Sequence, residues 1–160
     1  MSSQVARALK QKRKFPTREA EVVLGLRLLA TRILEPWEKF LKTHSDLSVS
    51  QYNVLRILRG SHPGRLPSSE VGQRMVARDP DVTRLVDRLV RRGLVDRQRS
   101  DADRRVVEVG ITPKGMAALK ALDPHVARMP KAVVGPLGQR KITQLAVLLD
   151  ELLAKFGTFP

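Results

Sequence analysis

Arginine side chains that could bind phosphate and guanine recur at helical spacing in residues 80–92. Arg84, Arg88 and Arg91 lie three or four residues apart, so a helix places them on one face. The guanidinium fork fits phosphate oxygens and the O6/N7 edge of guanine, so this face predicts entry into the major groove of DNA. With Asp87 beside them, the same arginines also fit a solvated face with intrahelical salt bridges.

The ends of this helix are marked by local signals. Asp79 is a suitable N-cap, Pro80 fits the first helical position, and Gly93 supplies a left-handed stop. Asp81 has two interpretations: it helps to cap the helix, which we favour, or it accepts a hydrogen bond from cytosine N4. The apolar stripe predicted to face the core is Val82, Leu85, Val86, Leu89 and Val90.

A basic hairpin is predicted directly after this helix. Residues 94–99 and 106–111 read as two short strands around the polar tip 100–105. Arg104 and Arg105 at such a tip fit the narrow, electronegative minor groove, and the neighbouring acidic residues could close the turn. An ordinary charged turn fits the tip equally well when it is considered alone.

The overall composition favours a polyanionic partner. The 160-residue chain has a formal charge of +14, and residues 1–18 contain six Lys or Arg and no acidic residue. Such an excess indicates nucleic acid first, with a merely solvated Arg-rich surface as the alternative. The chain has no cysteine, which excludes disulfides, thiolate metal sites and cysteine-based peroxide sensing.

Other function classes find little support. His44, His62 and His125 lie far apart in sequence, so we expect no metal site, and no motif indicates a cofactor or catalysis. The apolar runs are too short to cross a bilayer, and the N-terminus does not resemble a signal peptide. We therefore expect a soluble, cytoplasmic protein without a membrane partner.

Four segments are predicted along the chain. Residues 1–16 read as a flexible basic arm, and residues 17–46 as a long helix that begins at Thr17, with a kink or break near Leu34 because of Pro36. In this helix Trp37 is interpreted as a core residue, or alternatively as one wall of an effector pocket.

Residues 47–112 form the third segment. Ser48 and Gln51 make a capping box at the start of a helix, and residues 61–67 read as a loop. A short helix from Ser68 or Ser69 to about Val76 precedes the arginine-bearing helix. This order of helix, short helix, turn, arginine-bearing helix and ribbon predicts a winged helix-turn-helix.

Residues 113–160 are predicted to be helical. Thr112 is the N-cap of a helix that runs to about Met129 and bends or divides at Pro124. A last helix follows Gly135 and Pro136, with an apolar side from Ile142 to Phe156. The predicted fold is therefore mainly α with a small β-ribbon.

Several motifs in this order resemble the MarR (multiple antibiotic resistance regulator) family. The matching segments are 47–55, 82–89, 92–97, 103–105 and 111–115. The resemblance covers about residues 47–115, and the flanking helices match the architecture of the family without diagnostic residues.

The resemblance implies an obligate homodimer, built from the N- and C-terminal helices, that binds a pseudo-palindromic operator in double-stranded DNA. It also implies repression relieved by a small aromatic or anionic effector held between the dimerisation and DNA-binding parts. The implied DNA-binding residues are Ser68, Ser69, Arg78, Pro80, Asp81, Thr83, Arg84, Arg88, Arg104 and Arg105.

Two departures from the family pattern concern the turn and the base-reading positions. Val76 and Arg78 stand where the turn usually has Gly and then Ser or Thr, and Pro80 and Asp81 replace small polar residues. The operator sequence is therefore not readable. The alternative function is a sequence-indifferent architectural or RNA-directed nucleic-acid-binding protein, driven by charge. A scaffold that uses the domain only for protein contacts is a third class.

Overall fold

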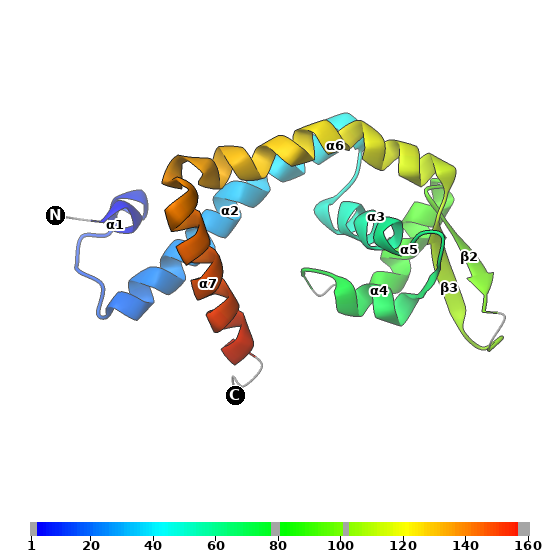
Figure 1. Ribbon diagram of the computed structural model, residues 1–160, viewed down its shortest axis with the longest axis horizontal. Helices are drawn as coiled ribbons and strands as arrows, with labels where there is room; N and C mark the ends of the chain where they lie inside the picture. The colour runs from blue at the N-terminus through cyan, green and yellow to red at the C-terminus, as the bar shows by residue number, and fades with distance from the viewer. Residues whose placement is uncertain (1–2, 78–80, 101–102, 157–160) are drawn as a thin grey trace. The chain divides into compact units, whose positions relative to one another are not determined.

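A predominantly helical fold with a small antiparallel sheet is seen in the computed structural model, which describes residues 3–77, 81–100 and 103–156 (Figure 1). The elements, in chain order, are α1 (Gln4–Ala8), α2 (Arg18–Ser45), α3 (Val49–Ser61), β1 (Leu66–Pro67), α4 (Ser68–Arg74), α5 (Val82–Arg91), β2 (Val95–Arg99), β3 (Val107–Ile111), α6 (Pro113–Val134), the 3₁₀ turn η1 (Gly135–Leu137) and α7 (Gln139–Phe156). The chain divides into two units, Met1–Met116 and Ala117–Pro160, and α6 runs from the first into the second.

The sheet has the strand order β1-β3-β2, with both pairs antiparallel. The predicted ribbon is confirmed: Val95 pairs with Ile111 at its base, and Arg99 pairs with Val107 near its tip. The prediction that residues 61–67 are entirely loop is wrong at its end, because Leu66 and Pro67 pair with Val109 and Glu108 of β3. That pairing joins residues more than forty positions apart, so a local pattern of turn formers cannot reveal it.

Helices α3, α4 and α5 lie together beside the sheet (Figure 1), and aliphatic side chains form the core among them. Helix α3 begins with the predicted capping box, in which Ser48 and Gln51 bond reciprocally, side chain to backbone N–H. The most deeply buried side chains of this domain are Leu47, Val54, Leu55, Leu58, Val71, Val86, Leu89, Val95 and Val109. This core holds α5 with its apolar stripe inward.

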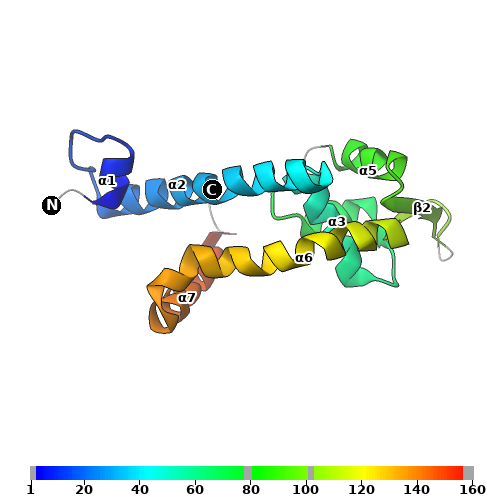
Figure 2. The ribbon, with the colours of Figure 1, turned by 90° about the horizontal axis from the view of Figure 1, so that it is seen from above.

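Residues 1–16 were predicted to form a flexible basic arm, and the structure has a short helix, α1, within this segment. The Ser3 hydroxyl accepts from the backbone N–H of Ala6, and Ala6 is buried. Helix α1 contacts α2 (Figure 2), where Gly25 leaves room for Val5; a Cβ at Gly25 would lie 3.2 Å from Val5 Cγ2. A helix of five residues shows too little periodicity to be recognised without this contact.

The proline residues do not divide the long helices. Helix α2 continues through Pro36, so a break near Leu34 is excluded, and α6 continues through Pro124 and Pro130, past the predicted end at Met129. A proline removes one backbone donor from a helix, and the flanking turns keep their own hydrogen bonds. The predicted helix starts are confirmed at Thr17 and Thr112, whose hydroxyls accept from Ala20 N–H and Gly115 N–H.

Helix α7 lies in the second unit and has no buried residue among those described. Its apolar side chains are therefore exposed within the single chain: Val147, Leu148, Leu149, Leu152, Leu153 and Phe156. Among the helices of the described ranges, none combines the length and the hydropathy that crossing a membrane requires.

Candidate DNA-binding site

Helix α5 starts two residues later than predicted, and its N-cap is Asp81 rather than Asp79. The Asp81 carboxylate accepts from the backbone N–H of Arg84 at 3.1 Å and forms an ion pair with the Arg84 guanidinium at 3.0 Å. Of the two interpretations of Asp81, the structure therefore supports capping. Arg78, Asp79 and Pro80 lie outside the described residues.

The two faces of α5 have opposite chemistry. Leu85, Val86 and Leu89 are buried in the core, as predicted, and Gly93 ends the helix with φ +67°. The outward face exposes four side chains that can donate hydrogen bonds: Thr83, Arg84, Arg88 and Arg91. Within the described ranges, Arg88 and Arg91 make no ion pair, so both guanidinium groups retain all their donors for another partner.

The tip of the β2–β3 ribbon is closed by Asp103. Its carboxylate accepts from the backbone N–H of Arg105 at 2.9 Å, and its carbonyl accepts from Val106 N–H at 2.9 Å. Arg104 and Arg105 are exposed, and neither has an ion pair with any residue that the structure describes. An acidic residue thus shapes the turn that carries two arginines, as the sequence suggested, while Asp101 lies outside the described residues.

A contact that sequence reasoning missed joins the ribbon to α5. Arg97 of β2 forms an ion pair with Asp87 of α5 at 2.6 Å, and it donates to the carbonyl of Thr83 at 3.3 Å. These two contacts fix the ribbon relative to the exposed face of α5. The only signal in the sequence was that both residues occur in the family motifs, which does not reveal that they touch.

Helix α4 and the turn after it lie beside α5. Ser68 begins α4 and Ser69 is exposed, and Pro67 provides no side-chain cap, so the first-turn N–H groups are available to a phosphate. The turn is held by Asn53 of α3, whose side-chain oxygen accepts from Val76 N–H at 3.0 Å. Val76 is 93% exposed where the family usually has glycine.

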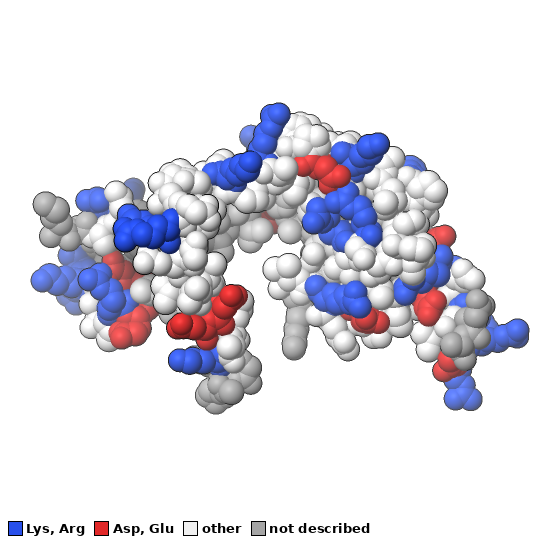
Figure 3. All heavy atoms as spheres, in the orientation of Figure 1, with Lys and Arg blue, Asp and Glu red and all other residues white. Residues whose placement is uncertain are grey.

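Basic side chains gather in patches on the face of the molecule that Figure 3 shows. Figure 3 shows Lys and Arg side chains over the helix-turn-helix region and at the end of the ribbon, with fewer acidic side chains among them. A second group of basic side chains surrounds α1 and the start of α2 (Figure 3). No group of three or more potential ligands for a metal ion is found in the part of the chain that the structure describes.

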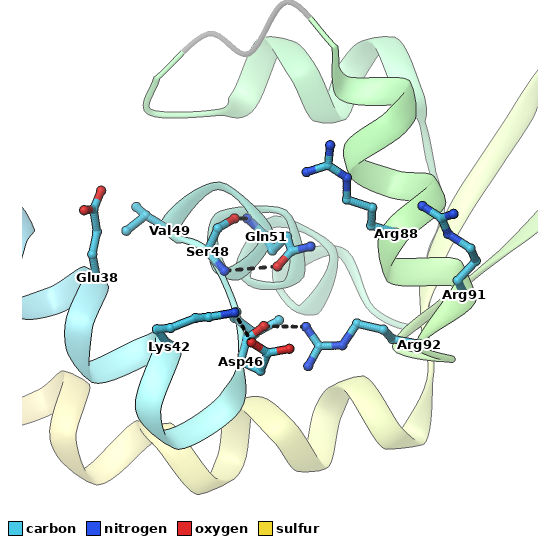
Figure 4. A pocket seen from close by; sticks show the side chains of 10 residues that line it. Glu38, Lys42, Asp46, Ser48, Val49, Gln51, Arg88, Arg91 and Arg92 are labelled. Carbon is cyan, nitrogen blue, oxygen red and sulfur yellow. Dashed lines mark hydrogen bonds and ion pairs between the residues drawn. The ribbon is translucent and has the colours of Figure 1, made fainter.

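A basic pocket of about 660 Å³ opens where the end of α2, the start of α3 and the last turns of α5 meet (Figure 4). Its lining is Glu38, Lys42, Asp46, Leu47, Ser48, Val49, Gln51, Arg88, Arg91 and Arg92. Four of these residues are cationic and two are acidic. The hydrogen bond from the Lys42 ammonium, helped by its charge and by Arg92, lowers the pKa of Asp46, so this acid stays ionised and its charge is balanced by Lys42.

Trp37 belongs to the core rather than to this pocket. It is 9% exposed, stacks on Phe40 with ring centroids 5.4 Å apart, and meets Tyr52 edge-on at 5.2 Å. It is absent from the lining of the basic pocket. Of the two interpretations of Trp37, the structure therefore supports a core residue.

The site combines three parts: a capped helix that presents arginines, a short helix beside it, and a ribbon with arginines at its tip. This combination defines a DNA-binding protein of the winged helix-turn-helix class. The comparisons with known proteins narrow this class. A model of the MarR family matches residues 45–106. The crystal structure of a MarR transcription factor from Planctomyces limnophilus is 35% identical, with 86% of this chain and 98% of that chain covered and a TM-score of 0.63. The chain therefore belongs to the MarR family and is a DNA-binding transcriptional regulator.

Two other relatives show the range of the similarity. The regulator MhqR of Bacillus subtilis is 27% identical over 106 residues, which are 66% of this chain and 72% of that protein. BpsR of Bordetella bronchiseptica, described as a protein whose DNA binding is regulated by 6-hydroxynicotinic acid, is 25% identical. The structural match covers 82% of this chain and 98% of the BpsR chain, with a TM-score of 0.71.

Proposed function

We propose that the chain is a homodimeric repressor that binds an inverted-repeat operator, with α5 in the major groove and the tip of the β2–β3 ribbon in the adjacent minor groove. The observation that carries the DNA-binding mode is the arrangement of α5. Its apolar face is buried while Thr83, Arg84 and Arg88 are exposed, and Arg97 fixes the ribbon beside it. The DNA contacts proposed for Arg104 and Arg105 rest on the exposed tip of the ribbon, and those of Ser68 and Ser69 on the start of α4. The contacts of Arg78 and Pro80 rest on the sequence alone, and Asp81 serves as the cap of α5 rather than as a base contact.

Exposed apolar side chains support the homodimer. In α2, Val22, Val23, Leu26 and Leu29 are between 41% and 57% exposed, and in α7, Leu153 and Phe156 are 70% and 68% exposed. Two helices with several exposed large apolar residues each are unusual for a monomer and typical of a subunit interface. Covering a half-exposed Leu or Val contributes about 1 kcal/mol, so a second copy of the chain gains several kcal/mol from each helix.

The alternative function, a sequence-indifferent binder driven by charge, is less well supported. Charge alone requires no fixed relation between a helix and a ribbon. Here, however, Arg97 joins the two elements and Asp103 sets the turn that carries the ribbon arginines. Rigid placement of donors serves readout of base edges and groove width. The proposal assigns no catalysis to the chain, because the relatives are named as transcriptional regulators.

An anionic effector is the regulator that the basic pocket fits best. Lys42, Arg88 and Arg91 contribute cationic groups, and the pocket of about 660 Å³ is large enough for a small aromatic carboxylate. The relative BpsR is described as regulated by such a carboxylate, 6-hydroxynicotinic acid. Because Arg88 is also a proposed DNA contact, an anion in this pocket would compete with DNA for the same guanidinium group.

Selection of random duplex by the purified protein at near-physiological salt tests the proposed function. We expect an inverted repeat with half-sites about one helical turn apart. Binding that shows no motif and collapses as salt rises would instead establish the charge-driven binder. For the pocket, a panel of aromatic carboxylates is titrated against the operator complex of the wild type and of Lys42→Gln. If the carboxylate releases DNA from the wild type at lower concentration than from Lys42→Gln, the pocket is supported as the effector site. If it releases DNA equally from both proteins, this assignment is contradicted.

A further inference from the structure

The guanidinium group of Arg92 joins the end of α5 to the end of α2. Arg92 is the C-terminal cap of α5, and its side chain donates to the carbonyl of Asp46 at 2.7 Å and to the carbonyl of Ser45 at 2.8 Å. Figure 4 shows this side chain extending from the end of α5 toward the residues that follow α2. The carbonyl of Arg92 in turn accepts from the Lys114 ammonium in the first turn of α6 at 2.8 Å.

The position of the Arg92 guanidinium group restricts movement of α2 relative to α5. Ser45 is the last residue of α2 and Asp46 is its left-handed cap, with φ +51°, so their carbonyls have no donor from a further helical turn. The planar guanidinium satisfies both carbonyls at once, and its positive charge suits the negative end of the helix dipole. Moving α2 relative to α5 would break two charge-assisted hydrogen bonds and leave both carbonyls without this donor.

The neighbouring arginines of α5 have a different environment. In the described residues, Arg88 and Arg91 make no ion pair and are exposed, whereas Arg92 is half-buried and both of its terminal nitrogens are engaged. The same short helix therefore carries arginines available to DNA and one arginine that is committed to α2. This contrast indicates that Arg92 has a positioning role.

We propose that Arg92 is a positioning residue that locks the DNA-reading helix to the dimerisation helix, and so sets the half-site spacing that the dimer accepts. The inference rests on the proposed dimer, in which α2 belongs to the subunit interface. With the lock intact, the two copies of α5 are held at a fixed separation. Without it, each DNA-binding domain adjusts to the DNA, and the protein tolerates operators of other spacings.

The test compares the wild type with Arg92→Lys and Arg92→Ala on the selected operator and on operators with one base pair added or removed between the half-sites. Arg56→Lys is the matched control, because Arg56 is exposed on α3 and makes no ion pair with any described residue. The measured quantity is the ratio of the affinities for the selected and altered spacings. Lysine keeps the charge but cannot satisfy two carbonyls as a planar fork.

We expect the ratio to fall about 5-fold or more in Arg92→Ala, to an intermediate value in Arg92→Lys, and not at all in Arg56→Lys. Affinity for random duplex stays near the wild-type value in all variants, which a general loss of folding would not allow. A ratio in Arg92→Ala equal to that of the wild type would overturn the proposal.

Hydrogen exchange gives a second readout that needs no operator. In the wild-type dimer, the amides in the last turns of α2 and α5 should exchange with similar protection, because opening one end requires release of the other. In Arg92→Lys both turns should lose protection together, while the amides of α3 keep theirs. Unchanged protection at both turns would refute the lock, whatever the operator selection shows. If the selection finds no operator but both turns lose protection, the proposed function is refuted and the lock is not.

Discussion

Gly115 lies in the first turn of α6, at a place where the backbone of the domain leaves no room for a side chain. A Cβ at this position would lie 2.2 Å from the carbonyl oxygen of Leu94 and 2.8 Å from Ile111 Cγ1. The oxygen belongs to the residue before β2 and already accepts from Thr112 N–H at 3.1 Å. A backbone atom cannot turn aside as a flexible side chain does, so in Gly115→Ala the start of α6 must move away from the base of the ribbon.

The expected cost follows from three contributions. Overpacking of this kind costs roughly 1–3 kcal/mol, and disturbing the hydrogen bond to Leu94 costs about 1 kcal/mol. The higher helix propensity of alanine recovers about 1 kcal/mol. The free energy of unfolding of Gly115→Ala should therefore fall by roughly 1–3 kcal/mol, which lowers Tm by several degrees, at about 2–4 °C per kcal/mol for a chain of this size.

Gly60→Ala is the matched control, because Gly60 lies in helix α3 and a Cβ there would meet no atom within 4 Å. This substitution should raise the free energy of unfolding by about 0.5–1 kcal/mol. Both variants are melted in circular dichroism at one protomer concentration, since the stability of a dimer depends on concentration. If Gly115→Ala melted at or above the temperature of Gly60→Ala, the reasoning from the Leu94 contact would be wrong.

The other predictions concern DNA binding and assembly. Arg84→Ala should weaken operator binding by about 1–3 kcal/mol and random-duplex binding by less, measured by fluorescence anisotropy; equal losses on both would leave only a phosphate contact. Replacing Arg104 and Arg105 together by alanine should cost roughly 2–4 kcal/mol of operator affinity and flatten its salt dependence, and an unchanged affinity would remove the ribbon tip from the mechanism. Deleting residues 136–160 should give a monomer or an insoluble chain in sedimentation, because the apolar side of α7 is removed, and a soluble dimer would contradict the assembly model. Leu153→Glu should shift the wild-type dimer toward monomer without unfolding it, since this side chain is 70% exposed within one chain; an unchanged dimer constant would place the interface elsewhere.

Much of the fold was predictable because its signals act over a few residues. The Ser48–Gln51 capping box, the Thr112 cap and the left-handed Gly93 each depend on atoms no more than three or four positions away, and each is confirmed. The ribbon strands also follow from alternation and turn residues. The same holds for the arginines of the candidate site, since helical spacing alone places Arg84 and Arg88 on one exposed face.

The errors came from choices that distant parts of the chain decide. The sequence places two aspartates near the start of α5, and the N-cap is Asp81 rather than the predicted Asp79. Helix α1 forms because Val5 fits against Gly25, and β1 forms because Leu66 meets Val109. The contact of Val5 with Gly25 and the pairing of Leu66 with Val109 cannot be recognised from a window of ten residues, because the partners lie farther apart than that.

The sequence by itself determined the element types, the arginine-bearing face of α5 and the family. It did so because capping, periodicity and charge spacing are properties of neighbouring residues. Only the tertiary structure decided how the candidate site is held together, through Arg97 on Asp87 and Arg92 on the end of α2. These contacts join residues ten and forty-six positions apart, and a long side chain such as arginine has many partners within reach until packing fixes one of them.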